Sequence, residues 1–154
     1  MNKQVIYVLL LLIGASGFAQ DNFTQEQAQG VVDTFFEGFH KGDSTMMRSV
    51  MAPNMISQTV FSDKQGNHRL VEGSPDEFLK AIADRPADQV WKEMLLSYEV
   101  QIDGNLANVW TPYEFYLNEN FSHCGANQFT LARTNEGWKI VHLIDSRRRS
   151  SCKD

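Results

Sequence analysis

The chain is short of the features that mark several classes of protein. Its 154 residues include only ten glycines and four prolines, with no low-complexity segment and no internal repeat, which excludes collagen-like, disordered and solenoid architectures. The 14 basic residues are outnumbered by 19 acidic ones, and this balance opposes binding to nucleic acid, which needs a clustered positive field. The 42% hydrophobic content suffices for a core, so one globular domain is expected.

Long apolar runs are also missing, apart from one at Val5–Ile13 that follows a single positive charge. Its nine residues are too few to cross a bilayer as a helix, which takes about 20. Small residues follow the run, so the pattern predicts a signal peptide over residues 1–19, cleaved between Ala19 and Gln20. A buried N-terminal helix is the alternative, but the run lacks a polar face. Residues 20–154 are therefore expected to form a single secreted or periplasmic domain without a stable membrane anchor.

Cysteine is scarce, with only Cys124 and Cys152 present. Two thiols cannot complete a structural zinc site, and the four histidines show no metal-site spacing. No glycine-rich phosphate loop is present either, so neither a metal nor a cofactor is expected. In an exported protein the two cysteines are candidates for a disulfide, whose loop of about 28 residues would stabilise the fold by about 3 kcal/mol. Two unpaired thiols are the alternative.

Three helices are predicted in the first part of the mature chain. From Thr24 to Lys41 apolar residues recur at spacings of three and four, behind a Thr cap with Gln three residues later. Ser44–Met51 predicts a second, short helix that Pro53 stops. Ser74-Pro75 opens a third helix, with proline in its first turn, and Pro86 ends it.

Alternating patterns predict strands in the remainder of the chain. The expected strands are a hairpin of Met55–Phe61 and His68–Glu72, and then a four-strand meander of Val90–Asp103, Leu106–Leu117, Phe121–Arg133 and Trp138–Arg147. Helices first and strands last indicate an α+β domain whose curved sheet wraps the helices. Because both faces of the strands carry apolar residues, the outer face should also be covered, which favours a homodimer.

This order of elements resembles the nuclear transport factor 2-like superfamily, and more narrowly its exported SnoaL-like or "putative lumazine-binding" branch. The likeness covers about Phe23 to Cys152. It is carried by the element order and by four motifs: Trp110-x-x-Tyr113-x-Phe115, Phe121-Ser122-His123-Cys124-Gly125, Gly137-Trp138-Lys139-Ile140-Val141 and Asp145-Ser146-Arg147-Arg148.

The resemblance implies a cone-shaped, curved, mostly antiparallel sheet wrapped around about three N-terminal helices, with a pocket between sheet and helices and a homodimer through the outer face of the sheet. It does not imply one activity, since the superfamily includes ketosteroid isomerase, polyketide cyclases, dehydratases and transport adaptors. The carboxylate base and acidic donor of the ketosteroid-isomerase route are not recognisably matched, and Asp145 with Tyr113 is the nearest pair.

The last hairpin predicts which side chains share the pocket face. A three-residue loop with Gly137 in the left-handed conformation pairs Thr134 with Trp138. That register places Leu131 opposite Val141, Phe129 opposite Leu143, Asn127 opposite Asp145 and Gly125 opposite Arg147, with His123 at the polar end. A register shifted by one residue would bring His142 and Ser146 beside His123 and Asn127 instead.

The first register predicts a ligand site. Its residues are Tyr98, Tyr113, His123, Asn127, Asp145 and Arg147. Asp145 and His123 are the best candidates for proton transfer, while Asn127 and Arg147 could hold an oxyanion. The structural alternatives are a simple Asp145–Arg147 ion pair, a rim histidine and tyrosines that belong to the core.

Three functions fit these observations. The leading hypothesis is an exported protein that binds a small, partly apolar molecule without catalysis. The second is an isomerase, cyclase or hydratase. The third is a protein-interaction module without a ligand. Cavity volume separates the third from the others, because a ligand site encloses about 300 to 1,000 Å³.

Overall fold

The protein is described here by a computed structural model that covers residues 23–149 and residue 152. The predicted signal peptide, residues 1–19, and its cleavage site lie outside the described residues. Within the described part of the chain, no helix is long and apolar enough to cross a membrane.

Three helices and seven strands make up the described domain. In chain order they are α1 (Gln25–Lys41), α2 (Ser44–Val50), β1 (Met51–Ser62), β2 (His68–Gly73), α3 (Pro75–Ala83), β3 (Trp91–Leu95), β4 (Glu99–Asp103), β5 (Leu106–Leu117), β6 (Asn120–Thr134) and β7 (Gly137–Arg148).

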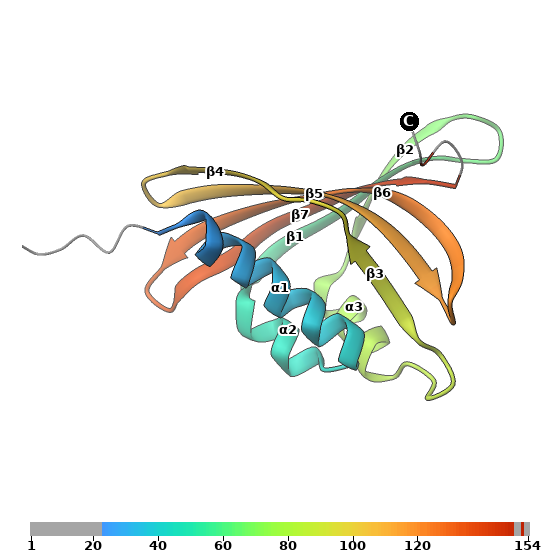
Figure 1. Cartoon of the computed structure of the whole chain (residues 1–154), viewed down its shortest axis with the longest axis horizontal. Helices are drawn as coiled ribbons and strands as arrows, with labels where there is room; N and C mark the ends of the chain where they lie inside the picture. The colour runs from blue at the N-terminus through green and yellow to red at the C-terminus, as the bar shows by residue number, and fades with distance from the viewer. Residues whose placement is uncertain (1–22, 150–151, 153–154) are drawn as a thin grey trace, which may run out of the picture.

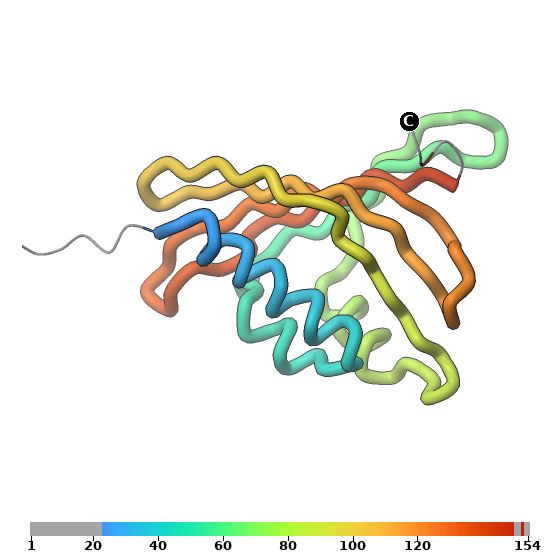
Figure 2. Tube along the Cα trace, in the orientation of Figure 1, coloured from blue at the N-terminus to red at the C-terminus, as the bar shows by residue number. Residues whose placement is uncertain are grey.

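The strands form one sheet in the order β2-β1-β7-β6-β5-β3, with β4 also paired to β5. All pairs are antiparallel except β1 with β7. The three helices lie together on one face of this curved sheet (Figure 1). Figure 2 shows β3 running from the sheet towards the helices. The predicted α+β architecture is confirmed.

Helix α1 forms as its sequence predicts and supplies much of the core. The Thr24 hydroxyl accepts a hydrogen bond from the Gln27 N–H while the Gln27 side chain accepts one from the Thr24 N–H, completing a capping box. Gly42, at a φ of 73°, ends the helix. Phe35 and Phe36 are buried and make edge contacts with Phe129 on β6. This packing fixes α1 across the inner face of the sheet.

The segment Val90–Asp103 is two strands rather than the single strand predicted. Leu95 pairs with Tyr113 and Glu99 pairs with Trp110. The stretch between the two pairs is therefore one residue longer on the β3–β4 side than on β5. The break lies opposite Pro112, which has no N–H to donate and whose carbonyl accepts from the Leu96 N–H. An interruption of this kind lets β3 bend away from β4.

Two predicted element ends also differ. Strand β1 begins at Met51 and runs through Pro53, rather than starting at Met55. A proline is tolerated there because the β1–β7 pairing is irregular between Met51 and Ile56. Helix α3 ends at Ala83 with Asp84 as its C-cap, before the predicted stop at Pro86.

The β6–β7 hairpin contains both of the registers considered from sequence. Near the turn Thr134 pairs with Gly137 and Leu131 pairs with Ile140, so the predicted Thr134–Trp138 and Leu131–Val141 pairs are wrong. The reason is a bulge at Val141, which adds one residue to β7.

Beyond that bulge the predicted register holds. Phe129 lies opposite Leu143, Asn127 opposite Asp145 and Gly125 opposite Arg147. The alternative that turned His142 inward is excluded at this end of the sheet, since His142 contacts Gln58 instead. The half of the hairpin that bears on the cavity was therefore predicted correctly.

Candidate functional site

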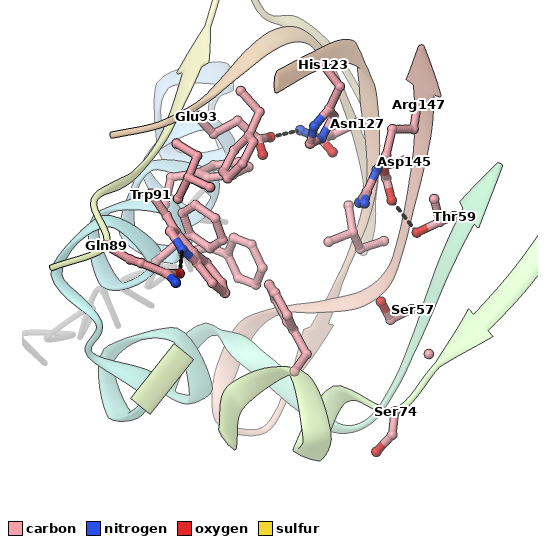
Figure 3. A pocket seen from close by; sticks show the side chains of 18 residues that line it. Ser57, Thr59, Ser74, Gln89, Trp91, Glu93, His123, Asn127, Asp145 and Arg147 are labelled. Atoms are coloured by element: carbon pink, nitrogen blue, oxygen red, sulfur yellow. Dashed lines mark hydrogen bonds and ion pairs between the residues drawn. The ribbon is translucent and has the colours of Figure 1, made fainter. Parts of the chain in front are cut away.

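A cavity of about 500 Å³ lies between the inner face of the sheet and helices α1 and α3. Its lining residues come from most elements of the fold: Phe35, Phe36, Phe39, Ser57, Thr59, Gly73, Ser74, Phe78, Gln89, Trp91, Glu93, Phe115, Leu117, His123, Asn127, Leu143, Asp145 and Arg147. Figure 3 shows these side chains converging, with aromatic rings on one side and polar groups on the other. A volume of this size matches the usual range of small-molecule sites.

The apolar part of the cavity is a continuous set of aromatic rings centred on Phe39. The ring centroid of Phe39 lies 6.0 Å from that of Trp91, 6.2 Å from that of Phe115 and 6.2 Å from that of Phe78. Phe115 in turn lies 4.8 Å from the His123 ring. Helices α1 and α3 thus join strands β3 and β5 in one aromatic wall, suited to the flat or apolar part of a ligand.

Asp145 anchors the polar end of the cavity. Its Oδ1 accepts a hydrogen bond from the Thr59 hydroxyl at 2.6 Å, and its Oδ2 accepts from Tyr113 at 3.2 Å and from Arg147 Nε at 3.1 Å. The Arg147 side chain is 44% exposed whereas that of Asp145 is 13% exposed, so the ion pair runs from the cavity wall to its mouth. The carboxylate is well supplied with donors, and it fixes the direction of the Arg147 guanidinium.

Tyr113 contacts this end of the site from behind. It is buried and does not line the cavity, but its hydroxyl reaches Asp145 and also the Ser146 carbonyl at 3.3 Å. The pKa of Tyr113 is raised chiefly by burial and also by the negative charges of the neighbouring Asp145 and Glu93. The phenol therefore stays protonated and acts as a donor that supports Asp145.

Glu93 is the carboxylate that the sequence reasoning missed. Its Oε1 accepts a hydrogen bond from Asn127 Nδ2 at 2.7 Å, and its backbone N–H donates to His40 Nε2 at 3.0 Å. The pKa of Glu93 is raised to about 7, chiefly by desolvation and to a smaller extent by the charge of Asp145, while the Asn127 hydrogen bond and the charge of Arg147 act in the opposite direction. A largely buried carboxyl in this state can hold or release a proton near neutral pH.

A signal for Glu93 was present in the sequence. In β3 the residues Trp91, Glu93 and Leu95 alternate with exposed ones and share the inner face. An acidic residue between two apolar residues on the inner face of a strand indicates a role other than core packing, because burying a carboxylate is costly. The sequence predicted one uninterrupted strand over residues 90–103, and in such a strand Glu93 does not stand out.

His123 lies at the junction between the aromatic and polar parts. Its ring packs edge-on against Tyr113, and Ser122 Oγ lies 3.0 Å from its Nδ1. The pKa of His123 is lowered to about 4, chiefly by burial and also by the positive charge of Arg147. The imidazole is therefore neutral at physiological pH and adds no charge to the cavity.

The structure brings four of the six predicted ligand-site residues to the cavity wall: His123, Asn127, Asp145 and Arg147. Tyr113 stands behind the wall, as described above. Tyr98 lies outside the lining set, because it occupies the break between β3 and β4 and its hydroxyl donates to Asp33 on α1. The prediction that Tyr98 presents its hydroxyl to the pocket therefore does not match its position.

Cys124 and Cys152 form a disulfide with an S–S distance of 1.96 Å. Cys124 is buried next to His123 on β6 and pairs with Arg148 on β7. The bridge thus ties the segment after β7 to the strand that carries His123 and Asn127. Among the described residues, no cluster of three or more His, Cys, Asp or Glu side chains could hold a metal ion.

The helices on a cone-shaped sheet, with a cavity between them, define a nuclear transport factor 2-like fold, and comparison with known proteins agrees. The sequence profile of the family described as "Putative lumazine-binding" matches residues 24–143, and the chain belongs to this family. No curated protein matches the chain in sequence.

Solved structures of the same fold come from several bacteria. One is an NTF2-like protein of unknown function from Shewanella baltica, with a TM-score of 0.57 and 19% identity, covering 84% of this chain and 100% of that one. A second, described as a "putative dehydratase from the NTF2-like family" of Streptomyces avermitilis, has a TM-score of 0.60 and 18% identity, covering 81% and 96%. A third, an NTF2-like protein with a cystatin-like fold from Novosphingobium aromaticivorans, has a TM-score of 0.62 and 18% identity, covering 82% of each chain. At these identities the likeness shows the fold alone.

Proposed function

We propose that this chain is an exported protein that binds a small, partly apolar molecule in the cavity between sheet and helices. The observation that carries the proposal is the cavity itself, about 500 Å³ with an aromatic wall and one polar end. A few polar groups in a largely apolar pocket are what fixes the orientation of a bound small molecule. The membership of the "Putative lumazine-binding" family supports a small-molecule ligand.

The test is native mass spectrometry of the protein purified from its own exported fraction, compared with denatured samples. A reproducible extra mass that is lost on denaturation supports the proposal. Ser57 lines the cavity from β1, so Ser57→Trp should fill it and abolish the extra mass. Gln101→Trp, on an exposed position of β4, is the matched control and should retain it. An extra mass that survives Ser57→Trp would place the ligand elsewhere.

Export is part of the proposal and rests on the pattern of the first twenty residues. A disulfide between Cys124 and Cys152 suits an oxidising compartment. N-terminal sequencing of the protein from the periplasm or medium should give Gln20 as the first residue. Recovery from the cytoplasm with Met1 retained would overturn this part.

A homodimer through the outer face of the sheet is proposed as well. The face of the sheet that points away from the helices carries exposed apolar side chains, including Ile56 and Val60 of β1 and Trp110 of β5. Covering them would remove apolar surface from water. Trp110→Glu should convert the dimer to a monomer in analytical ultracentrifugation, whereas Glu136→Gln in the β6–β7 turn should not. A wild-type protein that is monomeric at micromolar concentration would contradict the proposed homodimer.

A second candidate function is acid–base catalysis of the isomerase, cyclase or dehydratase type. Glu93 favours it, because a cavity carboxyl with a pKa of about 7 can exchange protons under physiological conditions. The dehydratase description of the Streptomyces avermitilis protein supports the same class. Turnover of an extracted ligand, lost in Glu93→Gln while binding persists, would establish it. A ligand returned chemically unchanged after long incubation favours binding alone.

A further inference from the structure

The two carboxylates of the cavity are satisfied to different extents. Asp145 accepts three side-chain hydrogen bonds, from Thr59, Tyr113 and Arg147. Glu93, within the described part of the chain, receives one side-chain hydrogen bond, from Asn127. Figure 3 shows Asn127 between Glu93 and the Asp145–Arg147 pair. Of the two carboxylates, Glu93 is the one left with capacity for a donor from a ligand.

The charges of the cavity lining are also unbalanced. The lining holds two carboxylates, Glu93 and Asp145, against one guanidinium, Arg147. The guanidinium donates to Asp145 through its Nε and offsets that carboxylate, and the neutral His123 contributes no positive charge. An ionised Glu93 therefore leaves the site with one uncompensated negative charge. Burying such a charge is costly unless a cation arrives with the ligand.

The surroundings of Glu93 suit a cation rather than an anion. Trp91 lies two residues away on the same face of β3, and Phe39 and Phe115 complete the adjoining wall. Aromatic faces carry partial negative charge and attract ammonium groups within about 6 Å. An anionic ligand would instead meet the negative charges of Glu93 and Asp145, which outnumber the single guanidinium of Arg147 in the cavity lining.

We propose that the cavity binds an organic amine, whose ammonium group donates to Glu93 and whose apolar body lies against the aromatic wall. This inference rests on the proposed ligand-binding function and names its ligand class. The cavity of about 500 Å³ holds an amine that carries one or two rings. Burial raises the pKa of Glu93, and an ammonium group placed beside the carboxylate would oppose this effect by favouring the charged form.

Three probes with the same bicyclic body test the proposal: 1-naphthylmethylamine, 1-naphthylmethanol and 1-naphthoic acid, titrated calorimetrically into the mature protein at pH 8. The amine is expected to bind about tenfold or more tightly than the alcohol, and the acid most weakly. Equal affinities, or tightest binding of the acid, would overturn the amine assignment while leaving the ligand-binding function intact. Failure of all three to bind, together with a protein free of retained ligand, would count against both.

Variants locate the recognition group. Glu93→Gln should remove the preference for the amine, lowering its affinity about tenfold or more, and leave the affinity for the alcohol within about twofold. Glu99→Gln removes the same charge from an exposed position on β4 and should leave the preference unchanged. An amine preference that survives Glu93→Gln would refute the role of Glu93. Circular dichroism establishes that each variant is folded before titration.

The pH dependence of the wild-type protein gives a readout that needs no variant. The titratable and polar groups near Glu93 come from four elements: Tyr113 of β5, Asn127 and His123 of β6, Asp145 and Arg147 of β7, and His40 of α1, which contacts the Glu93 backbone. With the pKa of Glu93 at about 7, the ionised fraction falls about tenfold between pH 8 and pH 6. The affinity for the amine should fall by about that factor, and that for the alcohol should not. An amine affinity that is flat over this range would overturn the proposal.

Discussion

The Tyr113 hydroxyl donates a hydrogen bond to Asp145 Oδ2 at 3.2 Å, although strand β6 separates the strands of the two residues. Gly125 makes this contact geometrically feasible. It pairs with Tyr113 on one side and with Arg147 on the other, and a Cβ at this position would overlap the Ser146 carbonyl and contact the Tyr113 ring. The missing side chain lets a residue of β5 support the polar end of the cavity from behind.

Gly125→Ala should therefore destabilise the protein by about 3 kcal/mol, since the backbone carbonyl it would strike cannot move without breaking the β6–β7 pairing. Chemical denaturation measures this. Gly30→Ala is the control: Gly30 is exposed on α1 with open space around it, so alanine should stabilise the helix by about 0.5 to 1 kcal/mol. Equal behaviour of the two variants would show that the close approach at Gly125 is not real.

Asp145→Asn should lower the free energy of unfolding by about 1 to 3 kcal/mol, because three donors lose their charged acceptor and Arg147 loses its partner. Asp103→Asn, at the exposed end of β4, should be neutral within about 0.5 kcal/mol. Denaturant midpoints of the two variants make the comparison. A neutral Asp145→Asn would mean that the carboxylate does not organise this end of the cavity.

Glu93 should make stability depend on pH in the direction opposite to a salt-bridged carboxylate. Its pKa is raised from 4.5 to about 7 in the folded protein, so the folded state binds more protons than the unfolded state between these values. The contribution is fully present below about pH 4.5 and is lost as the pH rises through 7. We expect the free energy of unfolding to fall over this window, by about 3 kcal/mol at most.

The check on Glu93 compares denaturation at pH 5 and pH 8 in the wild type and in Glu93→Gln. In the variant, the free energy of unfolding should no longer fall by the amount that Glu93 causes between pH 5 and pH 8. Glu136→Gln, in the exposed β6–β7 turn, should retain the wild-type dependence of stability on pH. An unchanged slope in Glu93→Gln would assign the pH dependence to other groups.

Removing the disulfide should cost about 3 kcal/mol, because the unfolded chain regains the freedom of a loop with a sequence separation of 28 residues. The double variant Cys124→Ala, Cys152→Ala and the reduced wild type should both unfold at lower denaturant concentration. Adding a reductant to the double variant should change nothing. Indistinguishable stabilities of the oxidised and reduced wild type would indicate that the bridge adds no constraint.

Much of the fold was determined by local sequence alone. The Thr24 capping box and the spacing of Phe35, Phe36 and Phe39 predict α1 and its buried face, because both signals act within a few residues. The predicted register at the cavity end of β6 and β7 also holds, but only because the bulge at Val141 offsets the one-residue error made at the turn. Of the cavity residues, His123, Asn127, Asp145 and Arg147 followed from this register.

Only the tertiary structure decided which other side chains join those residues and how they are protonated. The carbonyl of Pro112 and the extra residue opposite β5 split the predicted strand, which moved Tyr98 out of the site. Glu93 lies far from Asn127 in sequence, and only the pairing of both β3 and β6 with β5 brings Glu93 Oε1 to 2.7 Å from Asn127 Nδ2. Desolvation and neighbouring charges then set the pKa of Glu93, and such effects depend on three-dimensional surroundings that no local pattern encodes.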